Sequence, residues 1–546
     1  MSAAAHLLAA PVLLPLATAA LLLGLGERWR DAKAGLNLAS LVASLLVAGW
    51  LLAQAQGVRA PVAVYLPGNW PVPFGIVLVL DGLAAGMLVL AACTALAGLL
   101  FSLARWHRAG VHFHPLLQLQ LAGLNGAFLT GDLFNLFVFF EVLLAASYGL
   151  LLHGGGSSRV RPGLHYIAVN VVASFLFLIG VALLYGVTGT LNMADIARKL
   201  PLVPVEDRGL LHASAALLAV AFLAKAGFWP LNFWLPAAYA AASAPSAAVF
   251  TVLTKVGVYT VLRLWTLCFP AGAGFSAHFG GALLVWGGLA TLAFGALGML
   301  RSHQLGRLAG YSVIASSGTV VAAAGLGTPA LTAGALFYLA SSTLGAAALF
   351  LLAELVERRR QAEVDPPRVD AGGQLPRFGE AAPPDANLDD SAAPVVGRPI
   401  PASLALLAAA FLLCAVVVAG MPPLSGFVGK LAMLHAIAQG GPRAPGLPGW
   451  LLFALLIVSS LTGGIALLRA FATHFWAANA RGPAALRLTE ALPVALLLAG
   501  CVAIAVSGER VLAFTSDVAA SLHAPGRYVD TVFDAKPVPA PTGAGP

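Results

Sequence analysis

Four ionisable side chains lie deep inside long apolar stretches, and their types are those that carry protons. They are Glu141, Lys225, Lys255 and Lys430. Inside a protein, a carboxylate or a lysine amine can bind and release a proton, whereas an arginine guanidinium keeps its charge. This set therefore predicts a buried proton relay.

Glu141 illustrates what it costs to bury such groups. It follows Asp132 by about nine residues within one apolar run, which at 1.5 Å per helical residue places it near the middle of a bilayer. Insertion scales assign about 2.5–3.5 kcal/mol to an ionised side chain at that depth, so four of them would cost roughly 10 kcal/mol together. The sequence therefore predicts partners for these groups, a water path, or both.

Glu141 and Lys225 have opposite charges, and we expect them to form a pair if their two helices pack together. Each charge would alter the proton affinity of the other, as a relay requires. The alternative is a static ion pair that joins two helices, because buried pairs are weak evidence of function.

Lys255 and Lys430 are expected to continue the same polar axis, with Lys430 as its final group. The alternative for Lys255 is a lysine bonded to carbonyls of a broken helix, and the alternative for Lys430 is a lysine that reaches the membrane interface. Arg263 lies two turns beyond Lys255. We expect a structural or snorkelling role for it.

Histidines near the predicted inner face are candidates for collecting protons, because histidine titrates near neutral pH. His303 is the main candidate, and His107, His112 and His114 cluster in another inner loop. The alternative is that these side chains are simply interfacial. Asp81 and Asp132 precede apolar runs, where helix capping or hydration is the expected role.

The elements that carry these residues are predicted to be transmembrane helices. The chain has 546 residues, of which 60% are hydrophobic and only 10% charged, with a mean hydropathy of +0.89. That composition excludes a soluble protein. Apolar runs long enough to span a bilayer lie near 5–26, 36–55, 77–102, 112–130, 133–152, 165–187, 209–241, 245–269, 281–300, 306–325, 330–355, 401–439, 450–475 and 489–507. The prediction is an all-α polytopic membrane protein with about fourteen transmembrane helices.

The loop charges predict the orientation of the chain. If the N-terminus is outside, the short inside loops hold twelve Lys or Arg and the short outside loops five, as the positive-inside rule requires. Both termini are therefore expected outside. The net charge of +8 is explained by these loops, so a nucleic-acid partner is not expected.

Two apolar runs are too long for one straight crossing, and each contains helix-breaking residues. The run 209–241 contains Pro230, and the run 401–439 contains Pro422 and Pro423. Proline removes a helical hydrogen bond, so we expect broken helices 7 and 12. Paired interruptions of this kind point to the ion site of a transporter; ordinary proline kinks are the alternative.

The two breaks suggest an internal repeat and hence a division of the chain. The predicted parts are an N-terminal three-helix segment (1–110), a first five-helix unit (111–270), a second five-helix unit (271–475) with an inner linker (358–400), and a last span with a disordered tail (476–546).

Several chemistries lack their usual motifs. The four cysteines are far apart, no paired mid-span histidines suggest haem, and no phosphate-binding loop or hydrolase motif is present. We expect no cofactor and no metal site.

Three motifs in order resemble the D subunit of Mrp-type multisubunit Na+/H+ antiporters. They are the stretch from Leu124 to Glu141, Lys225-Ala-Gly-Phe-Trp-Pro-Leu-Asn-Phe-Trp-Leu-Pro236, and Pro422-Pro-Leu-Ser-Gly-Phe-Val-Gly-Lys430. The wider superfamily includes the antiporter-like subunits of respiratory complex I. The resemblance implies fourteen helices with two inverted five-helix repeats, Glu141 and Lys225 as the coupling pair, Lys255 as the central group and Lys430 as the terminal group.

The expected function is proton translocation within a hetero-oligomeric antiporter of a bacterial inner membrane, which exports Na+ or another monovalent cation. The chain is expected to be a transporter subunit, with no enzymatic activity of its own. One alternative is a proton-pumping subunit of a complex I-like oxidoreductase or membrane hydrogenase. The other is a scaffold subunit that transports nothing.

Overall fold

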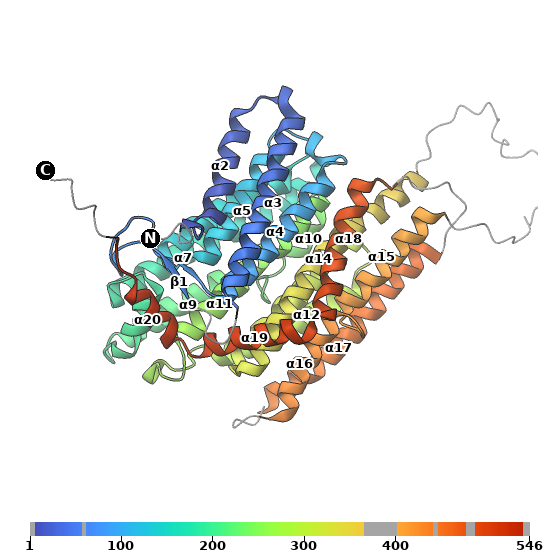
Figure 1. Cartoon of the computed structure of the whole chain (residues 1–546). Helices are drawn as coiled ribbons and strands as arrows, with labels where there is room; N and C mark the ends of the chain where they lie inside the picture. The colour runs from blue at the N-terminus through green and yellow to red at the C-terminus, as the bar shows by residue number, and fades with distance from the viewer. Residues whose placement is uncertain (1–5, 57–61, 365–400, 441–445, 477–485, 539–546) are drawn as a thin grey trace, which may run out of the picture.

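The computed structural model describes residues 6–56, 62–364, 401–440, 446–476 and 486–538, and these are almost entirely helical (Figure 1). Within these ranges, twelve helices are long and apolar enough to cross a membrane. Two further predicted spans correspond to shorter helices, α2 with 15 residues and α5 with 17. The multi-pass fold is thus confirmed, whereas the count of fourteen stays a prediction.

The N-terminal part consists of three helices and a small hairpin: α2 (Ala10–Gly24), α3 (Arg30–Gln54), β1 (Ala63–Tyr65), β2 (Leu78–Leu80) and α4 (Gly82–Ser102). The strands pair antiparallel, with Val64 opposite Val79. Asp81 caps α4 by accepting a hydrogen bond from the Ala84 amide, as expected.

Two series of helices follow, each containing one interrupted helix. The first comprises α5 (Phe113–Leu129), α6 (Leu133–Leu152), α7 (Ser157–Thr188), the short α8 (Met193–Lys199), α9 (Arg208–Lys225), α10 (Leu235–Ala241) and α11 (Ala244–Cys268). The second comprises α12 (Gly281–Arg301), α13 (Leu305–Leu326), α14 (Pro329–Val364), α15 (Ala402–Ala419), α16 (Ser425–Gln439) and α17 (Gly446–Phe471). The predicted boundaries between the units stay predictions.

The long runs are interrupted where the prolines lie. Residues 226–234 separate α9 from α10, and residues 420–424 separate α15 from α16. In both breaks the prolines are exposed on the surface of the chain, while the neighbouring Lys225 and Lys430 are buried. Each break thus turns its lysine toward the protein interior.

Three helices form the centre of the molecule. Every residue in the most apolar window of α11 is buried, and α13 and α14 are almost as completely enclosed. In the outer helices α3, α15, α17 and α18 (Leu488–Val506), only 33–39% of the corresponding window is buried. Lys255, on α11, therefore lies in the most protected part of the fold.

The C-terminal region departs from the prediction. Two helices that were not predicted, α19 (Gly508–His523) and α20 (Gly526–Asp534), follow the last span, and α19 crosses the ends of α4 and α14 (Figure 1). Buried Val518, Leu522 and Tyr528 anchor the two helices. The prediction missed them because they are too short and too polar to read as spans. Helix α14 also continues to Val364, beyond the predicted start of the linker, whose residues 365–400 lie outside the described ranges.

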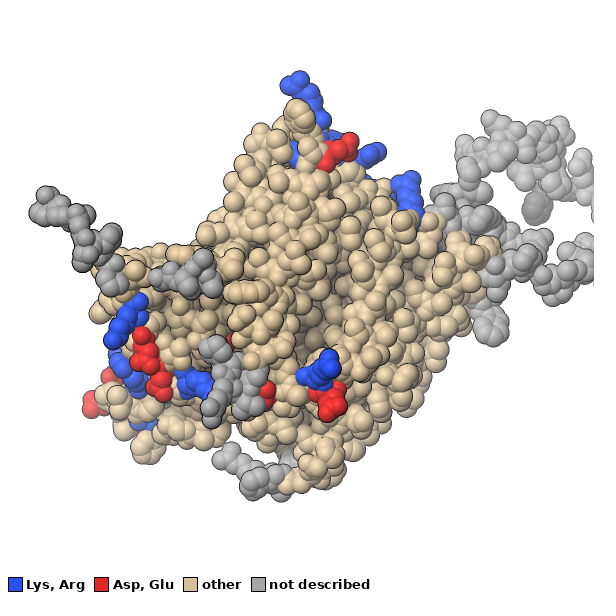
Figure 2. All heavy atoms as spheres, in the orientation of Figure 1, with Lys and Arg blue, Asp and Glu red and all other residues tan. Residues whose placement is uncertain are grey.

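Charged side chains gather at the two ends of the molecule, and a wide uncharged belt separates them on the face shown in Figure 2. This distribution is that of a protein that spans a bilayer.

Candidate functional site

Glu141 and Lys225 are joined through a serine hydroxyl. Ser174, on α7, donates to Glu141 Oε1 at 2.5 Å, and Lys225 Nζ donates to Ser174 Oγ at 3.3 Å. In the described part of the chain, the two charged groups form no direct ion pair. The predicted neighbourhood is thus present, with a neutral bridge that was not predicted from the sequence.

An aromatic cluster adjoins the lysine side of this bridge. Lys225 Nζ lies 5.0 Å from the centre of the Phe140 ring, a distance at which the ring face attracts a cation. Phe140 in turn packs on Phe177 and Phe222, which also pack on each other. Since none of these side chains can accept a proton, Ser174 is the polar link between α6 and α9.

Lys255 is almost completely enclosed, with 1% of its surface exposed. Its Nζ donates to Ser317 Oγ at 3.1 Å and to the Val313 carbonyl at 3.4 Å, both on α13. The alternative considered for Lys255 placed it on carbonyls of the broken seventh span; its carbonyl partner belongs to α13 instead.

The backbones that carry Lys225 and Lys255 are in close contact. A Cβ added at Gly257 would lie 2.7 Å from the Ala226 nitrogen and 2.7 Å from the Phe222 carbonyl oxygen. Only a residue without a side chain lets α11 approach the end of α9 this closely. The two lysines therefore sit on adjoining segments.

Lys430 fills the second break. Its Nζ donates to the Ala419 carbonyl at 3.2 Å, to Ser459 Oγ at 3.2 Å and to Ser460 Oγ at 2.8 Å. In a continuous helix the Ala419 carbonyl would accept from residue 423, which is a proline without an N–H. The lysine thus satisfies a carbonyl that the break has freed. The alternative of a lysine that reaches the interface does not fit this buried position.

Gly420 makes room for the Lys430 side chain. Its φ of +71° lies in the left-handed region that glycine adopts without strain. A Cβ at this position would lie 2.9 Å from Lys430 Cδ. The lysine chain therefore lies directly over this glycine.

Hydroxyl pairs occupy the region between Lys255 and Lys430. Ser316 bonds to Ser342 across α13 and α14 at 2.7 Å, and Ser341 bonds to Ser425 across α14 and α16 at 2.7 Å. None of these residues was predicted. The signal was present as three Ser-Ser dipeptides inside apolar spans, at 316–317, 341–342 and 459–460, each of which contributes to this polar axis.

Arg263 has the structural role expected of it. Its guanidinium forms a bidentate ion pair with Asp81, at 2.6 and 2.7 Å, and this pair ties α11 to the start of α4. Asp132 caps α6 through the Asn135 amide, and burial raises the pKa of this carboxyl.

The histidines lie apart from the lysine row. His303 is exposed in the loop between α12 and α13. His107 is buried, which lowers the pKa of its imidazole, and His114 bonds to Asn37 at 2.8 Å. His107 and His114 are therefore packed within the protein.

A polar cavity of about 400 Å³ opens near the expected inner end, lined by residues that include Glu354, Arg159 and Tyr239. Tyr239 Oη shares a hydrogen bond of 2.6 Å with Thr254 Oγ1, next to Lys255 in the chain. The cavity thus approaches the lysine row from one side, and His303 is not part of its lining. Glu354 was not singled out from the sequence, because it lies near the end of a long span.

A many-helix membrane fold with two interrupted helices and a buried row of lysines defines an ion-transporter component. A family model described as "NADH:quinone oxidoreductase/Mrp antiporter, TM" matches residues 130–368. The chain is 49% identical over 537 residues to the D subunit of a probable K(+)/H(+) antiporter of Rhizobium meliloti (strain 1021), covering 97% of this chain and 98% of the relative. It is 34% identical over 472 residues to the D subunit of an Na(+)/H(+) antiporter of Alkalihalophilus pseudofirmus, covering 85% of this chain and 87% of the relative.

A solved structure supports the same family assignment. A chain in "Structure of Mrp complex from Dietzia sp. DQ12-45-1b" superposes with a TM-score of 0.80 at 25% identity, covering 98% of this chain and all of the other. The chain belongs to the D-subunit family of Mrp-type multisubunit cation/proton antiporters. It is a transporter component and works with partner subunits, as expected.

Proposed function

We propose that Glu141, Lys225, Lys255 and Lys430 carry protons through the membrane in that order along the polar axis. The observation that supports this most is that their hydrogen-bond partners are neutral serine hydroxyls and backbone carbonyls. A hydroxyl can accept from an ammonium and donate to an amine. At Lys255, the Ser317 hydroxyl can therefore bond to either protonation state of the lysine.

The proposed proton movement is inward and drives a monovalent cation outward. Moving one charge through 100 mV is worth about 2.3 kcal/mol, so an electrogenic exchange could expel a cation against its gradient. The cation itself is proposed to cross in a partner subunit. The relative with 49% identity is named for K+ and the one with 34% for Na+, which favours K+ as the exported cation.

We further propose a bacterial inner-membrane location with both termini outside. The end drawn uppermost in Figure 2 shows mainly Lys and Arg, which supports its assignment to the inner side. Since the proposed proton movement is inward, His303, which was predicted from the sequence as a proton-collecting group, and the cavity beside Glu354 would lie at the exit of the path.

The central test is cation-induced pH change in everted vesicles that contain the complete complex. Glu141→Gln and Lys225→Ala are expected to abolish antiport while the complex assembles at wild-type abundance. Ser147→Ala is a matched control, because this buried α6 serine bonds to Tyr166 and to a backbone carbonyl. Normal antiport in both charge variants would instead support the scaffold alternative.

The same vesicles distinguish K+ from Na+ as the exported cation, and an antiporter from a redox-driven proton pump. Addition of KCl should dissipate the pH gradient at lower concentration than NaCl if K+ is the exported cation. Proton pumping that requires NADH and no added cation would favour the complex I-like alternative.

A further inference from the structure

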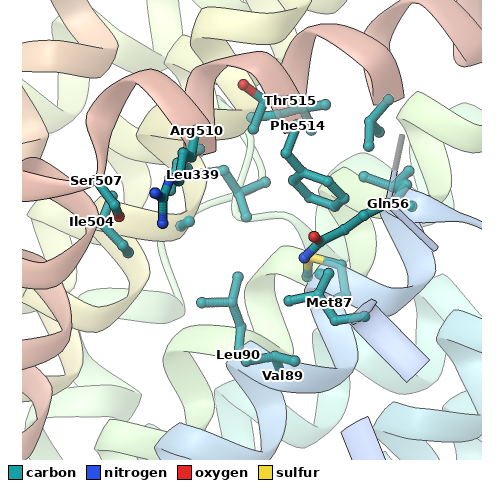
Figure 3. A pocket seen from close by; sticks show the side chains of 18 residues that line it. Gln56, Met87, Val89, Leu90, Leu339, Ile504, Ser507, Arg510, Phe514 and Thr515 are labelled. Carbon is teal, nitrogen blue, oxygen red and sulfur yellow. The ribbon is translucent and has the colours of Figure 1, made fainter. Parts of the chain in front are cut away.

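A second cavity lies at the other end of the molecule, beneath the lateral helix α19. It has a volume of about 540 Å³ and is bounded by the end of α3 and by α4, α14, α18 and α19 (Figure 3). This size is within the range of about 300–1,000 Å³ that is typical of small-molecule sites. No group of the proposed proton relay lines it.

The walls of this cavity differ in polarity along its depth. Met87, Leu90 and Leu339 line the part between the spans, and Ser507 and Arg510 belong to the α18–α19 corner (Figure 3). Apolar walls inside the membrane region and a cation at its boundary match the two parts of a phospholipid, an acyl chain and a phosphate.

Arg510 is available to a ligand. It is exposed, and among the described residues it has no hydrogen-bond or ion-pair partner. Its chain neighbour Glu509 is also exposed but does not line the cavity. The guanidinium can therefore form a bidentate contact with a phosphate group, which arginine geometry favours.

We propose that this cavity binds one anionic phospholipid, with an acyl chain along Leu90 and Leu339 and the phosphate on Arg510. Helix α19 crosses the ends of the spans (Figure 1), where the head groups of a bilayer lie. The bound lipid would join α19 to α4 and α14.

Water would find few hydrogen-bond partners along the apolar walls. A flexible acyl chain fits both the volume and the lining.

The head group is expected to decide which lipid binds. An acyl chain is already in apolar surroundings in the bilayer, so its transfer into the cavity favours no lipid class. One arginine at the membrane surface contributes about 1 kcal/mol toward an anionic lipid, equivalent to about fivefold in retention.

Native mass spectrometry of the complete complex, purified from nanodiscs of phosphatidylglycerol mixed with phosphatidylcholine, tests this proposal. The wild type should retain phosphatidylglycerol preferentially, and Arg510→Gln should lower that retention about fivefold. Arg301→Gln is the matched control, an exposed arginine at the end of α12 that should change nothing.

A second variant tests the acyl-chain part of the site. A Cβ at Gly86 would meet only Phe514 Cε1, at 3.9 Å. Gly86→Leu should therefore fill the cavity and lower the retention of phosphatidylglycerol and phosphatidylcholine alike, while the complex stays assembled. Equal retention in wild type and Arg510→Gln would overturn the proposal. Displacement of phosphatidylglycerol by added inorganic phosphate would also overturn the proposal, because the site would then bind a free anion without an acyl chain.

Discussion

Replacing Ser174 by alanine would remove the hydroxyl that links Glu141 to Lys225. The substitution deletes one oxygen from a buried site, so its effect on packing should be small. Each hydrogen bond to a charged group contributes about 1.5–3 kcal/mol, and Ser174 makes one such bond on each side, at 2.5 and 3.3 Å.

The loss of one of these bonds in the transfer step sets the expected magnitude. Since about 1.4 kcal/mol corresponds to tenfold in rate, Ser174→Ala should slow antiport by about tenfold to about a hundredfold. Ser174→Thr keeps a hydroxyl at this position and should restore most of the rate.

The assay is the initial rate of cation-induced pH change in everted vesicles, at matched complex abundance. Ser147→Ala again serves as the control for loss of a buried hydroxyl. A wild-type rate in Ser174→Ala would refute the inference that the bridge is part of the proton path. A drop in assembled complex equal to the drop in rate would show that the hydroxyl is only structural.

Three further substitutions test the structure around the relay. Asp81→Asn leaves the Arg263 charge uncompensated and should destabilise the chain by about 3–5 kcal/mol, seen as a lower melting temperature of the complex; an unchanged melting temperature would contradict the role assigned to the pair. Gly420→Ala strains a left-handed residue by about 1–3 kcal/mol and displaces Lys430, so antiport should fall in complexes that still assemble, and a normal rate would argue against this packing. Gly257→Ala places a Cβ 2.7 Å from the backbone at the end of α9, so α11 must move away and both stability and antiport should decrease; wild-type behaviour would show that the contact is looser than described.

The spans and the helix breaks could be predicted from the sequence because the bilayer imposes strict rules. An apolar run must reach a certain length, and a proline inside it removes a hydrogen bond that lipid cannot replace. The charged residues stood out for the same reason, since each is costly in hydrocarbon. Lys225, Lys255 and Lys430 are all buried in the structure, whereas their roles in transport await the experiments above.

The partners of these residues could not be predicted, because they depend on how the helices pack. Serine is tolerated in any transmembrane helix, since it can bond to its own backbone, so Ser174 and Ser317 gave no signal individually. The pairing of Arg263 with Asp81 joins residues 182 positions apart. Helix α19 was missed because a lateral helix at the membrane surface need not be continuously apolar.

Two buried cationic side chains, Arg263 and Lys255, are stabilised by different kinds of partner, and this difference supports the proposed relay. Arg263 faces a carboxylate at 2.6 Å, and this pair is stable only while both groups keep their charges. Lys255 faces a hydroxyl and a carbonyl, and the hydroxyl can also donate to a neutral amine. Deprotonation of Lys255 would thus leave its hydrogen bond to Ser317 intact with the donor reversed. The first arrangement fixes two helices, whereas the second allows a proton to leave and return without disrupting the core.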